Sequence, residues 1–80
     1  MNEAAVRADL RAYITREMIR DAAYPLGDDE PFVPTLADSY ALAELGVYIE
    51  SQYNLYIPDP ELTVEKMGTL NKAVARVMRG

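Results

Sequence analysis

Residues 38–58 read DSYALAELGVYIESQYNLYIP, and this stretch decides how the chain folds. It opens with Asp38 and Ser39, residue types that favour a helix start because their side chains accept hydrogen bonds from free backbone N–H groups. Apolar residues follow at helical spacing until Asn54 and then Ile57-Pro58 end the helix. The face predicted to point inward carries Leu42, Leu45, Gly46, Ile49 and Tyr53. The opposite side carries Tyr40, Glu44, Val47, Tyr48 and Ser51.

A second amphipathic pattern precedes this stretch and predicts a helix at the N-terminal end of the sequence. Its apolar stripe consists of Val6, Leu10, Tyr13, Ile14 and Met18. Asn2 is the expected N-cap, and the helix should end near Tyr24 because Pro25 disfavours a helical conformation in the residue before it. Glu17 falls inside the predicted stripe and Ile19 falls outside it.

The C-terminal part predicts two more helical elements. Residues 58–68 hold a short helical turn at most, with Thr63 as its cap and Gly68 as its stop. Thr69 caps a last helix, in which Lys72, Arg76 and Arg79 lie outside the apolar stripe. That stripe consists of Leu70, Ala73, Val74, Val77 and Met78. No alternating strand pattern of useful length is present, so we expect an all-α fold. It would be one domain over residues 1–80, a small bundle of three main helices plus one short helix.

A long irregular loop, residues 25–37, is expected between the first two main helices. It reads PLGDDEPFVPTLA, and its three prolines, glycine and three consecutive acids leave little scope for regular structure. Four apolar side chains should hold it against the core, namely Leu26, Phe32, Val33 and Leu36. We interpret the acidic cluster Asp28-Asp29-Glu30 as a solvated face, because it lacks the spacing of a calcium-binding loop.

Composition excludes several classes of function. The chain has no cysteine and no histidine, which removes disulfides, thiolate metal sites and the usual general base near neutral pH. No phosphate-binding loop, dinucleotide fingerprint or nucleophile elbow is present. Seven charged residues among the first twenty argue against a signal peptide or a membrane span. We therefore expect a cytoplasmic, monomeric protein that is not an enzyme and has no metal site.

The charges are segregated along the chain, whose formal net charge is −5. Residues 25–62 hold eight acids and no base, whereas residues 63–80 hold one acid and four bases. An acidic middle segment repels phosphate backbones, which argues against a nucleic acid partner, and attracts basic protein surfaces. The alternative interpretation is a generic acidic surface that only keeps the protein soluble.

Ser39 stands out as a candidate site of modification. At the start of a helix its hydroxyl should be exposed, and a phosphate ester there would be favoured by the helix dipole and the free N–H groups. Without a histidine to activate it, Ser39 is a poor catalytic nucleophile. It makes better sense as a residue modified by another enzyme, although spacing alone favours an ordinary first helical residue.

The stretch from Leu36 to Asp59 resembles the signature of acyl carrier proteins and peptidyl carrier proteins. Asp38-Ser39-Tyr40 occupies the position of the family's Asp-Ser-Leu motif. Glu44-Leu45, Tyr53 and Ile57-Pro58-Asp59 match further positions without a gap. The resemblance implies an acyl-carrier-like fold in which Ser39 carries 4′-phosphopantetheine, attached from coenzyme A by a phosphopantetheinyl transferase.

The same resemblance implies partners and a role. The partners would be the transferase, an acyl- or aminoacyl-loading ligase, and downstream synthase or transferase enzymes with basic docking patches. Tyr40, Glu44, Val47 and Glu50 are the expected partner-binding residues. Leu45, Gly46 and Ile49 are the expected lining of a cargo pocket, with Gly46 leaving a gap for cargo or for a close helix contact.

Three departures from the family pattern bear on the pathway. Tyr40 replaces the usual leucine, Gly46 replaces a bulky aliphatic residue, and the helix is less acidic than in primary fatty-acid carriers. These features favour polyketide, lipopeptide or nonribosomal peptide biosynthesis over a fatty-acid-synthesis carrier, which stays an alternative. A rival from another class is an unmodified helical interaction module that binds through the face of Tyr40, Val47 and Tyr48.

Overall fold

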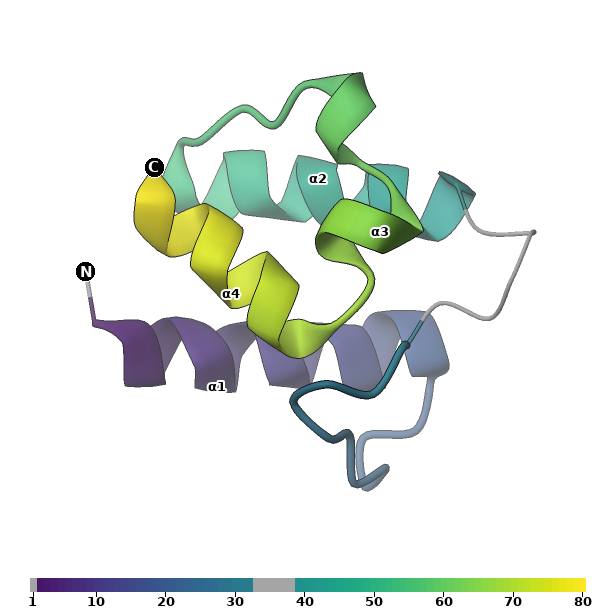
Figure 1. The fold of residues 1–80 in the computed structure, drawn as a ribbon. Helices are drawn as coiled ribbons and strands as arrows, with labels where there is room; N and C mark the ends of the chain where they lie inside the picture. The colour runs from purple at the N-terminus through teal and green to yellow at the C-terminus, as the bar shows by residue number, and fades with distance from the viewer. Residues whose placement is uncertain (1, 33–38) are drawn as a thin grey trace.

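The computed structural model describes residues 2–32 and 39–80, with the backbone alone at Ser39 and Tyr40. Figure 1 shows the arrangement of the labelled helices: α4 packs against α1, and the short α3 packs against α4 and α2. The elements are α1 (Glu3–Tyr13), a π-helical turn (Ile14–Ile19), α2 (Ser39–Tyr53), a 3-10 turn (Asp59–Glu61), α3 (Val64–Met67) and α4 (Leu70–Arg79). The described part of the chain contains no strand, which confirms the predicted all-α class with three longer helices and a short one.

The core lies where the inner faces of the helices meet. Its side chains are nearly all aliphatic, as the helical spacing predicted, and the segments between the helices add Leu26, Phe32 and Ile57. The helices contribute Val6, Leu10, Ile14, Leu42, Leu45, Ile49, Met67, Leu70, Ala73, Val74 and Val77. Met78, expected in the α4 stripe, is instead 37% exposed, because it lies in the last turn of α4, beyond the buried Val77.

The first helix ends earlier than the sequence predicted. Its α-helical part changes at Ile14 into a π-helical turn, and Arg20 terminates it with φ 65°, so the expected end near Tyr24 is wrong. A π turn holds more residues than an α turn. Every side chain after it is therefore rotated about the helix axis, away from the position that the predicted apolar stripe assumes. This rotation turns Glu17 to solvent and brings Ile19 against the core, and so resolves both irregularities in the predicted pattern.

The caps predicted for three helices are confirmed. The Asn2 side chain accepts hydrogen bonds from two backbone N–H groups in the first turn of α1. Thr63 and Thr69 each accept one at the starts of α3 and α4. Asn54 has φ 54°, the left-handed conformation that commonly follows a helix end. These caps satisfy backbone groups that would otherwise lack partners.

The connection after α1 is anchored by apolar side chains, as expected for the part that is described. Leu26 and Phe32 are 4% and 7% exposed, and the Phe32 N–H donates to the Gly68 carbonyl at 3.1 Å. The Tyr24 hydroxyl donates to the Glu30 carboxylate, which fastens the turn between them. The two other expected anchors, Val33 and Leu36, lie outside the described residues.

The acidic cluster is exposed but is not merely solvated, which corrects the sequence interpretation. The Asp28 carboxylate pairs with Arg11 and lies 3.3 Å from Arg7 Nη1. Its backbone carbonyl accepts from the Asn71 N–H at 2.9 Å, and the Asn71 amide donates to Asp29 at 2.8 Å. The sequence could not show this because the partners belong to α1 and α4. The cluster therefore holds the connection against both helices.

No helix in the described part of the chain is both long enough and apolar enough to span a bilayer.

Candidate functional site

Ser39 is the first residue of α2, a helix of 15 residues. The described part of α2 begins at Ser39, and its first turn contains no acidic residue. Backbone N–H groups in a first turn lack helical partners and carry a partial positive charge, so a helix start at this position would favour a phosphate ester. Asp38, the expected cap, lies outside the described residues.

The inner face of α2 is built as predicted. Leu42, Leu45 and Ile49 are at most 1% exposed, and Gly46 is buried beside them. Of the three residues expected to line a cargo pocket, Leu45 and Ile49 are therefore packed core residues.

Gly46 faces a side chain of the segment between α2 and α3. A Cβ atom at Gly46 would lie 3.1 Å from both terminal carbons of Leu62, tighter than ordinary van der Waals contact. The missing side chain therefore lets Leu62 approach α2 closely. Beside this contact lies a small hollow of about 140 Å³, whose lining includes Gly46, Val47, Tyr56 and Leu62.

The outer face of α2 presents three of the four expected partner-binding residues to solvent. Glu44 and Glu50 are exposed, and Val47 is 67% exposed, the most exposed large hydrophobic residue among those described. The fourth, Tyr40, belongs to the first turn of α2. One apolar side chain between two carboxylates is a surface that suits a basic partner with an apolar contact.

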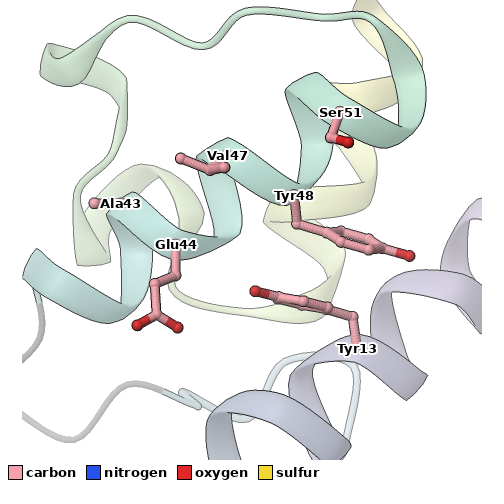
Figure 2. A pocket seen from close by; sticks show the side chains of 6 residues that line it. All are labelled: Tyr13, Ala43, Glu44, Val47, Tyr48 and Ser51. Carbon is pink, nitrogen blue, oxygen red and sulfur yellow. The ribbon is translucent and has the colours of Figure 1, made fainter.

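A larger open groove of about 500 Å³ runs between α1 and α2 (Figure 2). Its lining consists of Tyr13 from α1 and five α2 residues, Ala43, Glu44, Val47, Tyr48 and Ser51. The rings of Tyr13 and Tyr48 stack with centroids 4.0 Å apart and an interplanar angle of 16°. Tyr48 therefore packs against α1, so its expected place on the outward face is wrong. The reason is that an aromatic side chain at the edge of the inner face can turn toward a neighbouring helix.

Asp9 joins α1 to α2 beneath this groove. The Tyr48 hydroxyl donates to Asp9 Oδ1 at 2.6 Å, and the Tyr53 hydroxyl donates to the other carboxylate oxygen. Partial burial and then the hydrogen bond to Asp9 raise the pKa of Tyr48 to about 12, and the same causes raise the pKa of Tyr53. Both hydroxyls are therefore held protonated as donors, and α2 is fixed against α1.

The groove has a negative electrostatic environment near the Tyr13 hydroxyl. The pKa of Tyr13 is raised first by burial and then by the charges of Glu44 and Glu17. Glu17 forms an ion pair with Arg16 at 3.0 Å. Glu44 has no cationic partner among the residues that the structure describes. Figure 2 shows its carboxylate on the same side of α2 as the Tyr13 hydroxyl.

Arginine pairs reduce the charge excess of the acidic middle segment. Asp28 is paired with arginines of α1, as described above, and Glu61 accepts from Arg76 at 2.7 Å and from Arg79 at 3.2 Å. These arginines hold the pKa of Glu61 below its usual value. The two carboxylates of α2, Glu44 and Glu50, form no ion pair with any described residue.

Within residues 2–32 and 39–80, no cluster of three or more acidic side chains is arranged to hold a metal ion. No family model, curated protein or solved structure matched the chain.

Sequence reasoning missed Asp9 and Tyr13 as parts of the site. Their spacing of four residues did place them on one side of the first helix, next to the apolar stripe. The sequence does not show that this side of the helix contacts Tyr48 and Tyr53, because that contact depends on how α1 and α2 pack.

Proposed function

We propose that this protein is a carrier that holds acyl or aminoacyl groups as thioesters on a 4′-phosphopantetheine arm at Ser39. The observation that carries the proposal is that the serine of the Asp-Ser motif at residues 38–39 lies at the described N-terminal end of α2. The four-helix arrangement would then be that of acyl carrier proteins, with α2 as the central recognition helix.

Attachment of the arm is a phosphoryl transfer that a partner enzyme performs. The Ser39 Oγ would attack the phosphorus atom of coenzyme A that bears the pantetheine. The P–O bond to the second phosphorus breaks, adenosine 3′,5′-bisphosphate leaves, and the serine proton passes to a base of the partner. The start of α2 contributes an electrostatic environment that favours the resulting phosphodiester.

The carrier itself lowers no barrier in this proposal. Its arm keeps the substrate at a high effective concentration for each enzyme that docks on the domain. The exposed carboxylates Glu44 and Glu50 would speed the encounter with basic patches, while Val47 supplies an apolar contact. The partners are a phosphopantetheinyl transferase, a loading ligase and downstream enzymes of polyketide, lipopeptide or nonribosomal peptide biosynthesis.

Intact mass tests the proposal directly because the chain contains only two serines, Ser39 and Ser51. The protein is incubated with coenzyme A, magnesium and a transferase of broad specificity. We expect the mass to rise by one phosphopantetheinyl group in the wild type and in Ser51→Ala, which lies at the other end of the same helix. Ser39→Ala should show no addition. An unmodified wild type, or a modified Ser39→Ala, would contradict the proposal.

The rival interaction module predicts no mass change in any of these proteins. In its expected face of Tyr40, Val47 and Tyr48, the Tyr48 ring is stacked on Tyr13 and the Tyr48 hydroxyl is bonded to Asp9.

A further inference from the structure

The groove between α1 and α2 lies within reach of a group tethered at Ser39, so the following inference rests on the function proposed above. The arm has roughly thirteen bonds between phosphorus and sulfur, which correspond to just over four residues of extended chain, or ~15 Å. Along α2, a rise of 1.5 Å per residue places Glu44 about 7.5 Å and Tyr48 about 13.5 Å beyond Ser39. Both groove residues therefore fall within the length of the arm.

The groove is also the larger of the two spaces that flank α2. It measures about 500 Å³, against about 140 Å³ for the hollow beside Gly46. Leu62 already fills the space that the missing Gly46 side chain leaves. A tethered group of the size of an amino acid residue would therefore find more room on the α1 side of α2 than on the α3 side.

The walls of the groove define the chemistry of its occupant. The stacked rings of Tyr13 and Tyr48 and the exposed Val47 offer apolar and aromatic surface. Glu44 is the one acidic or basic side chain in the lining, and no cation among the described residues is paired with it. An occupant that carries a positive charge next to an apolar group satisfies both features, because tyrosine faces also attract cations.

We propose that this groove receives the aminoacyl group of the loaded carrier. The free α-ammonium group would lie by the Glu44 carboxylate, and an apolar or aromatic amino acid side chain would lie against the Tyr13–Tyr48 stack. An acyl group without the ammonium lacks the charged partner and occupies the groove less. The groove therefore selects aminoacyl cargo over simple acyl cargo.

The test compares two loaded forms that differ only in the ammonium group. The protein is loaded from amide-linked analogues of phenylalanyl-coenzyme A and 3-phenylpropionyl-coenzyme A, and intact mass verifies each addition. Backbone amide NMR spectra are then recorded at pH 6.5, below the usual α-amino pKa of about 7.7–8.0. The matched variants are Glu44→Gln and Glu65→Gln, which remove one negative charge from α2 and from α3.

We expect the phenylalanyl form to shift the signals of Tyr13, Glu44, Tyr48 and Ser51, which line the groove and not the hollow beside Gly46, more than the phenylpropionyl form does. Glu44→Gln should reduce the difference in signal shift between the two loaded forms by up to about fivefold, because an exposed ion pair changes an equilibrium constant by about that factor at most. Glu65→Gln should leave the difference unchanged. Equal shifts from both cargoes would overturn the inference, as would shifts confined to Ile57 and Leu62. These results would leave the proposed function standing, whereas absence of any mass addition overturns the proposed function and the inference together.

Discussion

The Tyr48 hydroxyl donates a 2.6 Å hydrogen bond to Asp9 Oδ1, and this bond ties the helix that begins at Ser39 to the first helix of the chain. The second oxygen of Asp9 accepts from Tyr53 five residues further along α2. Two donors thus converge on one carboxylate. This arrangement fixes the rotation of α2 about its own axis, and with it the direction in which Glu44 and Val47 point.

Asp9→Ala should therefore destabilise the protein by about 1–3 kcal/mol, because two partly buried hydroxyls lose their acceptor. For a domain of this size, each kcal/mol corresponds to a fall in Tm of about 4–8 °C. Thermal unfolding followed by circular dichroism measures the change. Glu3→Ala is the control, because Glu3 is an exposed carboxylate of the same helix; its Tm should fall by far less. Equal Tm values for the two variants would contradict the role given to Asp9.

The raised pKa of Tyr48 makes stability sensitive to alkaline pH. The hydroxyl has its ordinary pKa of 10.0 when unfolded and a pKa of about 12 when folded. Folding therefore favours the protonated form. The contribution of Tyr48 is complete below pH 10 and is lost as the pH rises toward 12.

Urea unfolding at pH 9 and at pH 11.5 checks this expectation by comparing wild type with Tyr48→Phe. Lysines also titrate in this range, so only the difference between the two proteins reports on Tyr48. The wild type should lose more stability than the variant between the two pH values. A parallel loss in both proteins would show that the Tyr48 hydroxyl ionises with its ordinary pKa.

The helices and their caps could be predicted because they depend on residues close together in the sequence. Asn2, Thr63 and Thr69 bond to backbone groups two or three residues away, so local pattern was enough. The π-helical turn was not predicted, although Glu17 and Ile19 misfitted the stripe, because a π turn has no signature of its own in side-chain spacing.

Features that depend on long-range packing could not be predicted from local pattern. The inward turn of Tyr48 and the pairing of Asp28 with Arg11 join segments far apart in the chain. The same holds for Leu62, which approaches Gly46 from another element. Ser39 as a site stays a prediction from the sequence, whereas the groove between α1 and α2 required the packing of these two helices.

Charge reversal on α2 should slow transfer of phosphopantetheine to the protein. Glu44→Lys and Glu50→Lys remove the carboxylates that no described cation neutralises, so kcat/KM of the transferase should fall. The wild-type value should also fall with added salt, because exposed charges are screened over about 8 Å at physiological ionic strength. Glu65→Lys, with the same change of charge on α3, should have less effect. Equal rates for all three variants, independent of salt, would indicate that docking is mainly apolar.

Substitutions at Gly46 should separate helix propensity from crowding. In Gly46→Ala, the better helix propensity of alanine stabilises the folded state by about 0.5–1 kcal/mol. This gain offsets the cost of moving the end of the Leu62 side chain a few tenths of an ångström away from the new Cβ atom. We therefore expect its free energy of unfolding to stay within about 1 kcal/mol of wild type. Gly46→Val adds branched bulk against Leu62 and should lose about 1–3 kcal/mol.

Leu62→Ala supplies the second half of the comparison in a double-mutant cycle. If Leu62 is the side chain that crowds position 46, Gly46→Val should cost less in the Leu62→Ala background than alone, since the two residues are in contact. Urea unfolding of the four proteins measures this coupling. Strictly additive effects would mean that valine meets the backbone or the core instead. Loading with cargo gives an independent check: because Gly46 does not line the groove, Gly46→Val should keep whatever stabilisation loading brings to the wild type. If the variant loses that stabilisation, the cargo lies beside Gly46 and not in the groove.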